Sequence, residues 1–492
     1  MGGKILFSHS YFYQLDPKQW KFKQPYPPLG TITAASVLQS AGHEVNLFDT
    51  NLKVDAKELV DKLSTFNPTY FVLYDDGFNY LTKMCLSNMR DAAFQMIGMA
   101  KKEGCIVIVS SSDATDHSAK YLQAGADYVI FGEGEKTLLE LCNSIENRIN
   151  KDLVDQIPGV ITLIDGVISK ASPRPVMQDL DQLPLPAWEL VDIDAYKEIW
   201  LKHHGYFSLN IATTRGCPFK CNWCAKPIYG NRYNSRSPKH VIKEIEYLIE
   251  KYQPDHFWMC DDIFGLKPGW VNEFAELVKE KNLQFNYKIQ SRADLLLKED
   301  NITALSESGA DTVWIGAESG SQSILDAMDK GITTQQIEES TLLLKRNNIK
   351  AAYFLQFGYL DETWQDIQAT LNMVLKLMPD EIGISVSYPL PGTKFYENVK
   401  GFLQEKQNWT DSDDLSMMFQ NTFPSGFYKI LHRYIHNRYR IQRGINQLKN
   451  LMQGKGSGNR LMRNFLSMIY NTPMSWVHGY QLQKLSRTNA DY

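Results

Sequence analysis

The sequence lacks the features of a membrane-spanning or secreted protein. No uninterrupted apolar segment approaches the roughly 18 residues of a membrane span. No signal peptide precedes the first expected strand, and Leu6 breaks the pattern for N-terminal myristoylation. Cysteine is scarce as well, because the chain has seven, an odd number, which indicates a reducing compartment rather than a disulfide framework. We therefore expect a cytoplasmic protein.

Acidic residues are nearly missing from the last part of the chain. Residues 421–492 contain 11 Lys and Arg but a single acidic residue, Asp491, so their net charge is +10. By difference, residues 1–420 hold 41 basic and 55 acidic residues, a net charge of −14. This asymmetry predicts an acidic partner for the basic tail, or docking of the tail onto the acidic body.

The composition that is present, 43% hydrophobic and 22% charged, is typical of globular proteins, and 492 residues suffice for two or three domains. Residues 1–150 alternate short apolar runs with amphipathic segments. This rhythm predicts a doubly wound, Rossmann-like α/β domain with a parallel sheet, whose ligands bind beyond the carboxyl ends of the strands. The expected strands are Lys4–Phe7, Glu44–Phe48, Tyr70–Leu73, Ile106–Val109 and Tyr128–Phe131, and the expected helices are Thr31–Ala41, Ala56–Leu63, Met89–Lys102 and Lys136–Ile149.

A proline-rich stretch, residues 151–205, predicts a linker that contains a small hairpin at Gly159–Ser169. A second strand–helix alternation follows, and Ser237-Pro238 supplies the N-cap and first-turn proline of one of its helices. Residues 401–492 are expected to be helical, with a break near 454–458. The strands expected in the second alternation are Leu209–Thr213, His256–Cys260, Phe285–Gln290, Thr312–Gly316, Ala352–Phe357 and Ile382–Val386.

Three of the cysteines form a tight C-x3-C-x2-C cluster, Cys217, Cys221 and Cys224, directly after an expected strand. Three thiolates at this spacing can hold three irons of a cubane cluster and leave the fourth iron open to a small molecule. A zinc site, which usually needs a fourth Cys or His nearby, is one alternative, and three unrelated core cysteines are another. The other cysteines, Cys85, Cys105, Cys142 and Cys260, are scattered, and Cys105 and Cys260 are expected in the core.

With Arg215-Gly216 before it and Trp223 before its last cysteine, this cluster resembles the signature of the radical SAM superfamily. The resemblance extends over most of residues 1–400. Within the superfamily, the chain is similar to the cobalamin-binding branch, which includes class B methyltransferases and the anaerobic Mg-protoporphyrin monomethyl ester cyclases. It implies a Rossmann-like cobalamin-binding domain over 1–150, a partial (βα)6 TIM-type radical SAM barrel over 206–400, and a helical C-terminal region. The segments that carry it are Pro27–Thr31, Asp127–Glu135, Leu183–Trp188 and Tyr388–Thr393.

The resemblance also implies contacts for S-adenosylmethionine (SAM) at successive strand ends. Carboxylates of Asp261 and Asp262 would accept from the SAM amino group, and Arg292 would bind its carboxylate. Glu318 and Ser319 stand where relatives bind the ribose, and Trp223 lies within the cluster motif. The alternative for each single polar residue is a capping or solvated role. After the fifth strand the chain reads Gly-Tyr-Leu-Asp-Glu-Thr, where relatives more often have Gly-Leu-Pro-Gly-Glu-Thr. The resemblance therefore does not predict the shape of that loop.

Cobalamin contacts are implied on the N-terminal domain, where glycines let the backbone approach a large flat ligand. The Asp-x-His-x-x-Gly motif that supplies a histidine to cobalt is absent, and His117 does not have its spacing. A relict α/β domain that binds nothing is the alternative. The implied contact residues are Gly30, Thr31, Ser111, Ser112, Asp113, Thr115, Gly132, Glu133 and Gly134.

The resemblance implies a 4Fe-4S enzyme that uses SAM and cobalamin, most often to methylate an unactivated carbon of a small-molecule or lipid-like substrate through a 5′-deoxyadenosyl radical. A donor such as flavodoxin or ferredoxin would supply the electron. An oxidative cyclase of the Mg-protoporphyrin ester type, a tRNA methylthiotransferase and a non-catalytic cofactor sensor are the alternatives. For residues 421–492 we weigh a helical cap against peripheral contact with a membrane; nucleic acid could use the same charges, but no base-reading motif accompanies them.

Overall fold

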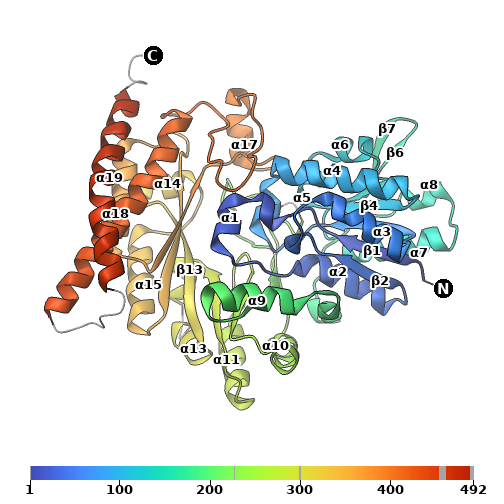
Figure 1. Cartoon of the computed structure of the whole chain (residues 1–492), viewed down its shortest axis with the longest axis horizontal. Helices are drawn as coiled ribbons and strands as arrows, with labels where there is room; N and C mark the ends of the chain where they lie inside the picture. Colours follow the sequence, from blue (N-terminus) through green and yellow to red (C-terminus); the bar gives the residue numbers. More distant parts are fainter. Residues whose placement is uncertain (1, 227, 299–300, 454–460, 488–492) are drawn as a thin grey trace.

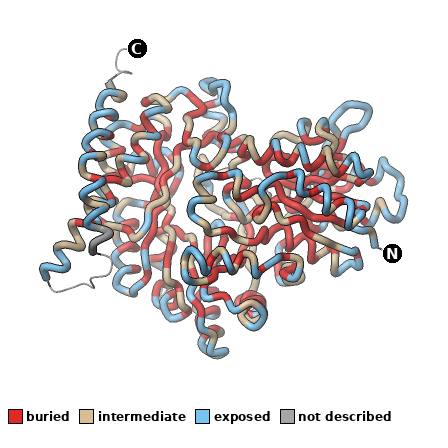
Figure 2. The backbone as a smooth tube through the Cα atoms, in the orientation of Figure 1, coloured by how far each residue is buried: buried red, intermediate tan, exposed pale blue. Residues whose placement is uncertain are grey.

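Two large sheets lie side by side in this computed structural model, and a pair of long helices covers the far side of the second sheet (Figure 1). The structure describes residues 2–226, 228–298, 301–453 and 461–487. The buried residues follow the two sheets, with the exposed ones on the surrounding helices and loops (Figure 2). Each sheet is therefore the centre of its own domain.

The first sheet has seven strands in the order β2-β1-β3-β4-β5-β6-β7. Strands β1 to β5 are parallel, and their β-branched and aromatic residues are buried between two layers of helices, as in Tyr70–Tyr74, all five of which are buried. The strands are β1 (Lys4–Ser8), β2 (Glu44–Phe48), β3 (Tyr70–Tyr74), β4 (Ile106–Ser110), β5 (Tyr128–Ile130), β6 (Val160–Ile164) and β7 (Val167–Lys170). The helices are α1 (Pro17–Phe22), α2 (Leu29–Ser40), α3 (Leu59–Phe66), α4 (Ser87–Lys102), α5 (Ser112–Asp116), α6 (Ser118–Gln123), α7 (Glu135–Glu146) and α8 (Lys151–Val154).

The expected hairpin belongs to this sheet rather than to a free linker. Strands β6 and β7 pair with each other antiparallel, and β6 pairs antiparallel with β5. The N-terminal domain therefore extends to Lys170, beyond the expected boundary at residue 150. The remaining linker carries a helix that the sequence analysis did not predict, α9 (Ile193–His204), whose Trp200 indole N–H donates to the carbonyl of Pro25 at 2.7 Å.

The second sheet has six parallel strands in sequence order, β8-β11-β12-β13-β14-β15, which confirms the partial barrel. A shift of register between Gly316 and Glu318 marks the end of β13. The strands are β8 (Ser208–Ile211), β11 (His256–Met259), β12 (Asn286–Ser291), β13 (Ala310–Glu318), β14 (Lys350–Phe357) and β15 (Glu381–Val386). The helices around them are α10 (Pro238–Tyr252), α11 (Trp270–Glu280), α12 (Ala293–Leu296), α13 (Asn301–Glu307), α14 (Gln322–Ala327), α15 (Thr334–Arg346), α16 (Trp364–Leu377) and α17 (Lys394–Val399).

The C-terminal region is only partly helical. After a short 3-10 turn at Lys400–Phe402, residues 403–424 form a loop, contrary to the expectation of helix from residue 401. This loop reaches the N-terminal domain, where Ser412 Oγ donates to Asp16 Oδ1 at 2.7 Å and Arg90 Nη2 donates to Asn408 Oδ1 at 3.0 Å.

Two long helices, α18 (Ser425–Met452) and α19 (Leu461–Arg487), then pack against each other at the outer side of the barrel (Figure 1). The break expected at 454–458 lies outside the described residues. Among the helices that the structure describes, none combines the length and the apolarity that crossing a membrane requires.

Candidate functional site

The cysteine loop begins at the carboxyl end of β8, and the residues before it are fixed by a buried carboxylate. Asp261, at the end of β11, accepts from the backbone N–H groups of Thr213 and Thr214, both at 2.7 Å, and from the Thr213 hydroxyl at 2.6 Å. Burial raises the pKa of Asp261 to about 6. This carboxylate is therefore occupied by the turn that aims the cysteine loop, whereas the sequence analysis assigned it to SAM.

Glycine is required where the loop leaves this turn. Residues Thr214–Arg215 (β9) pair with Asn234–Ser235 (β10), and Gly216 follows at φ +77°. A Cβ at Gly216 would stand 2.4 Å from the carbonyl oxygen of Arg232. Because neither the backbone angle nor the space admits a side chain, only glycine lets Cys217 follow directly on β9.

The three cysteines are half-buried and act on one another electrostatically. Burial is the main cause that raises the pKa of the Cys217 thiol, and it raises that of Cys224 to about 12; Cys221 adds to both shifts. Within the described residues no three His, Cys, Asp or Glu side chains lie close enough to share one metal ion. The donor set gives no support to a zinc site, but it suits a cluster in which each thiolate binds a different iron.

Asn222, directly after the second cysteine, ties the loop to three other strand-end loops. The Asn222 side chain donates to the carbonyl of Ala327 at 2.7 Å and accepts from the hydroxyl of Tyr359 at 2.9 Å. Its backbone N–H donates to the Met328 carbonyl, and its carbonyl accepts from the N–H of Phe395. Asn222 thus fixes the cysteine loop across the carboxyl edge of the barrel.

Arg292, at the end of β12, lies against the cysteine loop with its guanidinium group 3.7 Å from the ring centroid of Phe219. Its nitrogens donate to the carboxylate of Asp294 at 2.9 Å and to the carbonyl oxygens of Lys330 and Gly331. The structure therefore brings Arg292 to the cysteine loop, as expected for a cofactor site, and engages it with protein groups there.

Glu318, at the end of β13, forms a buried ion pair with Lys330, whose Nζ lies 2.6 Å from Glu318 Oε1. Glu318 has the left-handed φ of +58°, a strained value for a residue with a side chain. The thiol of Cys221 is among the groups that raise the pKa of Lys330, so this ion pair lies beside the cysteine loop. Ser319 follows, fully buried, with its hydroxyl 3.1 Å from that of Thr370.

Two further side chains complete this edge of the barrel. The indole nitrogen of Trp223 is buried and has no hydrogen-bond partner in the protein, so it is free to donate to a ligand. Asp262 pairs with Lys83 of the N-terminal domain at 2.7 Å, and both act electrostatically on Cys224. Of the expected SAM residues, Trp223 alone presents an unpartnered buried polar atom.

The N-terminal domain meets the cysteine loop through a buried three-residue ion cluster. Arg215, two residues before Cys217, donates to Glu133 at 2.5 Å and to Glu135 at 2.6 Å, and all three side chains are at least 90% buried. Its guanidinium group also lies 5.3 Å from the ring of Tyr229. Glu133 additionally accepts from the N–H of Met177 at 2.5 Å. Glu133, which the resemblance assigned to cobalamin, is thus engaged by the barrel.

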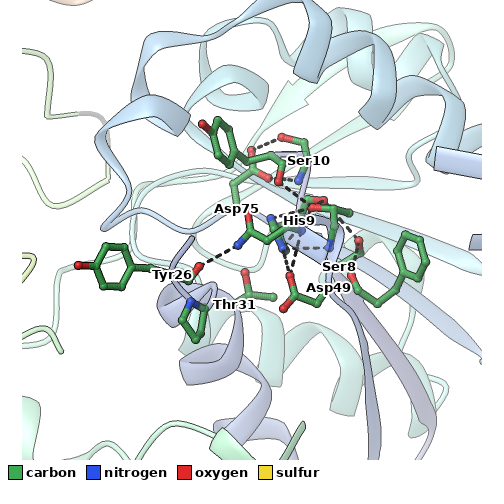
Figure 3. A network of polar contacts seen from close by, with 12 residues as sticks. Ser8, His9, Ser10, Tyr26, Thr31, Asp49 and Asp75 are labelled. Atoms are coloured by element: carbon green, nitrogen blue, oxygen red, sulfur yellow. Dashed lines mark hydrogen bonds and ion pairs between the residues drawn. The ribbon is translucent and has the colours of Figure 1, made fainter. Parts of the chain in front are cut away.

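A polar network fills the carboxyl ends of β1, β2 and β3 in the N-terminal domain (Figure 3). Ser10 donates to Asp75 through its N–H at 2.7 Å and its hydroxyl at 2.9 Å, and burial raises the pKa of Asp75 to about 6. His9 Nε2 lies 3.0 Å from Asp49, and His9 Nδ1 lies 3.0 Å from the hydroxyl of Thr50. Chain order reverses between β1 and β3, which is where doubly wound sheets bind ligands.

The other residues expected to bind cobalamin lie along the same edge, and most of them have partners. Asp113 is held by Arg90 at 2.5 and 2.7 Å and by the Tyr121 hydroxyl at 2.7 Å. The hydroxyl of Ser112 is buried without a partner. Three of the remaining residues donate hydrogen bonds: Gly30 to Asp76, Thr31 to the Tyr74 carbonyl, and Thr115 to the Ser111 carbonyl. Ser111 caps the N-terminus of α5. Gly134 packs on Tyr74, and Gly132 has a φ of +75°.

A small hollow opens beside this edge. Ser10, Asp75, Arg90 and Asp113 contribute to its lining, so both the switch point and the loop after β4 border it. Cys85 lies there as well, while Cys105, Cys142 and Cys260 are buried in the core. The expectation that Cys105 and Cys260 are core residues is confirmed.

Sequence reasoning missed Lys330, Asn222, Lys83 and Arg215 as parts of the site. Lys330 lies 12 residues from Glu318, and Lys83 lies 179 residues from Asp262, so neither has a helix or strand spacing that would signal it. Arg215 and Asn222 stand inside the motif itself, and their position next to Cys217 and Cys221 was the available signal.

Residues 211–374 match the model of the radical SAM superfamily. This span contains the cysteine loop, Arg292, the Glu318–Lys330 ion pair and Ser319. This span is a radical SAM domain. Within a radical SAM barrel, the strand ends that surround the cysteine loop are the functional edge.

Proteins similar to this radical SAM chain include methyltransferases and a cyclase. An uncharacterized methyltransferase of Pyrococcus horikoshii is 27% identical over 384 residues, 75% of this chain and 78% of the relative. The anaerobic magnesium-protoporphyrin IX monomethyl ester cyclase of a Synechocystis strain is 25% identical over 378 residues, 76% and 73% of the two chains. The hopanoid C-3 methylase of Methylococcus capsulatus is 24% identical over 373 residues, 75% and 67% of the two chains.

Two solved structures share both domains of the fold. The cobalamin-dependent radical enzyme OxsB, with aqua-cobalamin bound, superposes with a TM-score of 0.71 at 16% identity, over 98% of this chain and 72% of OxsB. The radical SAM methyltransferase TsrM from Kitasatospora setae, with cobalamin and a 4Fe-4S cluster bound, gives 0.67 at 17% identity, over 82% and 75% of the two chains. The arrangement of an α/β domain before a partial barrel is therefore shared with these proteins.

Proposed function

We propose that this chain is a cobalamin-dependent radical SAM methyltransferase that acts on an unactivated carbon of a small-molecule or lipid-like substrate. The observation that carries the proposal is the junction of the two functional edges. Arg215, next to the cysteine loop of the barrel, is bonded to Glu133 and Glu135 at the carboxyl edge of the N-terminal sheet. Groups held by the two edges would therefore face one another across a single site.

The residues present fit a 4Fe-4S cluster with SAM. Cys217, Cys221 and Cys224 would hold the cluster, and the unpartnered indole N–H of Trp223 would donate to SAM bound beside it. Arg292 and the Glu318–Lys330 pair place two cations and a carboxylate around the loop, which suits a ligand that carries both an amine and a carboxylate. The bound groups would supply one-electron cleavage of SAM, with cobalamin supplying the methyl group.

For cobalamin, the fit rests on the carboxyl edge of the first sheet. The unpartnered hydroxyl of Ser112 and the open backbone at Gly132 are available to a ligand there. Asp113 and Glu133 position Arg90 and Arg215 instead. In the barrel, Asp261 and Asn222 fix the cysteine loop from opposite sides and so keep its geometry independent of the ligand.

The reaction needs an electron donor, and two other activities compete with methyl transfer as the function of this chain. We infer that a small reduced carrier such as flavodoxin or ferredoxin supplies the electron. Oxidative ring formation is the second candidate, because a cyclase relative matches over a share of this chain as large as the first methyltransferase does. A tRNA methylthiotransferase gains no support, because Cys105 and Cys142, which a second cluster would need, are buried in the core.

The test uses anaerobically reconstituted protein, dithionite, SAM with a labelled methyl group, and cobalamin. We expect about four irons per chain, retained cobalamin, and release of 5′-deoxyadenosine measured by mass spectrometry. The variant Cys217→Ala, Cys221→Ala, Cys224→Ala should lose the iron absorbance and the cleavage, whereas Cys142→Ala in the core of the first domain should keep both. Iron retained in the triple variant would overturn the cluster assignment.

The same reaction with extract of the source organism separates the two candidate outcomes. Methyl transfer places the label in a new product, whereas ring formation consumes substrate without incorporating it. A product that forms without label would replace methyl transfer by cyclisation. Absence of 5′-deoxyadenosine under all conditions would contradict both.

A further inference from the structure

Helix α19 buries a side that is mostly polar. That side buries Asn471, Ser475 and His478, which are 2%, 4% and 7% exposed, together with one leucine, Leu482, which is 1% exposed. The amide of Asn437 on α18 lies 3.0 Å from the His478 ring, so this contact is held by a hydrogen bond. An amphipathic helix at the surface of a globular protein normally buries its apolar side. The orientation of α19 therefore leaves apolar side chains exposed on its outward side.

The outward side of α19 carries a continuous apolar and aromatic stripe. Trp476, Tyr480 and Tyr470 are 78%, 72% and 68% exposed, and four further apolar residues extend the stripe. At 3.6 residues per turn the seven side chains fall within an arc of about 140°. The outward side of α19 is drawn exposed along much of its length at the outer edge of the molecule (Figure 2). The other four residues of the α19 stripe are Phe465, Leu466, Ile469 and Val477.

The charged side chains of the hairpin formed by α18 and α19 are all cationic. Residues 425–487 contain no Asp or Glu. Arg433, Arg440, Arg443 and Lys449 of α18 are exposed on the same hairpin as the α19 stripe. By contrast, residues 1–420 have a net charge of −14. An anionic surface would attract the hairpin and repel the body, so contact would be restricted to this end of the molecule.

Charge also decides between a lipid surface and a second copy of the chain. Two copies joined through α19 would bring two basic hairpins together with no acidic residue of either hairpin to pair with. An anionic bilayer offers phosphate groups to the arginines and an acyl boundary to the aromatic side chains, which favour that depth. The helix cannot cross the bilayer, because Asn471, Ser475 and His478 are held against α18. It can lie in the plane of the interface.

We propose that α19 docks on an anionic membrane surface, with the α19 stripe inserted at the headgroup–acyl boundary and the arginines of α18 at the headgroups. This docking goes beyond the proposed methyl transfer and does not depend on it. It places a radical enzyme where a lipid-dissolved substrate would be reached without crossing water.

The test is flotation of the full-length, anaerobically purified protein with phosphatidylglycerol–phosphatidylcholine vesicles. We expect the protein to float with these vesicles at low salt, to float less with pure phosphatidylcholine, and to be released as salt rises. Trp476→Ser with Tyr480→Ser should lower the bound fraction by roughly tenfold or more, because two exposed aromatic anchors are lost. The control, Leu153→Ser with Val167→Ser, removes two apolar side chains of the N-terminal domain that are 60% and 69% exposed and should bind as the unaltered protein does.

Three results would overturn the proposal. The first is unaltered protein that stays in the soluble fraction with anionic vesicles at low salt. The second is equal binding by the Trp476→Ser, Tyr480→Ser variant and the unaltered protein. The third is a dimer in sedimentation that this variant abolishes, without vesicle binding, which would assign the stripe to a second copy. Circular dichroism of both variants checks folding, which substitution of exposed side chains should leave intact.

Discussion

At the scale of single residues, the ion pair between Glu318 and Lys330 differs most from what the sequence predicts. A carboxylate expected to bind ribose is bonded to a buried ammonium group beside Cys221. Gly316 makes this possible, because a Cβ there would stand 2.6 Å from the Lys330 nitrogen. Any ligand of Glu318 therefore meets a carboxylate that is already oriented and charge-balanced.

We predict that Arg292→Ala and Glu318→Ala each weaken SAM binding about ten- to a hundredfold while the iron content stays unchanged. The loss of one charge-assisted contact typically costs about 1.5–3 kcal/mol. Equilibrium dialysis of labelled SAM, with iron analysis of the same samples, measures both quantities. Glu338→Ala, which removes an exposed carboxylate paired with Lys376 on the helical layer, is the control. Unchanged SAM affinity in both site variants would show that SAM binds elsewhere on the barrel.

A second residue-scale prediction concerns Glu362, in the loop after β14. Its carboxyl group is fully buried and accepts from the N–H of Gly358 at 2.7 Å, and burial raises its pKa to about 8. Since the folded state holds this proton above pH 4.5 and the unfolded state does not, the group lowers stability as pH rises from about 4.5 to 8. The slope is at most about 1.4 kcal/mol per pH unit.

Glu362→Gln keeps an acceptor for Gly358 and removes the proton. We therefore expect the midpoint of thermal unfolding to fall less between pH 5 and pH 8 in this variant than in the unaltered cluster-free protein. Circular dichroism melts at four pH values measure the two slopes. Equal slopes would mean that Glu362 titrates normally in the folded protein.

At the scale of elements, the loop that carries Arg215 joins two domains through one buried cation and two carboxylates. Removing the cation alone leaves both carboxylates buried without their partner, which typically costs about 3–5 kcal/mol. We predict that Arg215→Met destabilises the protein by this amount in urea unfolding. Adding Glu133→Gln and Glu135→Gln should recover part of the loss, because the three residues act as a unit.

The same variants separate a structural from a ligand-binding role of Glu133. If Glu133 acts through Arg215, Glu133→Gln lowers stability but leaves the affinity for cobalamin within about threefold, measured by spectroscopic titration. If cobalamin binding is lost while the unfolding curve is unchanged, Glu133 contacts the cofactor and the ion cluster is secondary.

Periodicity predicted the regular elements well, because the strands of the first sheet are buried on both faces and those of the barrel bury alternate residues. All five parallel strands of the first sheet and all six of the barrel lie where their apolar runs stand in the sequence. The cysteine loop was predictable from spacing alone. The partners of Glu318 and Asp262 were not, because Lys330 and Lys83 reach them through the fold rather than along the chain. The loop 403–424 was missed because its apolar residues are spaced for burial against other elements, as for Met417 and Phe419, and not for a helix.

At the scale of the whole molecule, both nitrogens of His9 have partners, and His117 lies 3.8 Å from Asp113. These are the described histidines nearest the switch point and the loop after β4. We therefore predict that cobalamin binds without a protein nitrogen on the lower face of cobalt. The electron paramagnetic resonance spectrum of the cob(II)alamin form should lack hyperfine splitting from a coordinated nitrogen, and His117→Ala should leave it unchanged. Such splitting in the unaltered protein, lost in His117→Ala, would contradict this.

The bonds from Ser412 to Asp16 and from Asn408 to Arg90 also set an order of events during synthesis. The ribosome delivers the N-terminal sheet, complete at Lys170, about 240 residues before it delivers Ser412. At typical elongation rates the two are separated by roughly 12–50 s. For that time Asp16 and Arg90 of the nascent first domain lack the hydrogen-bond partners that the loop 403–424 later provides.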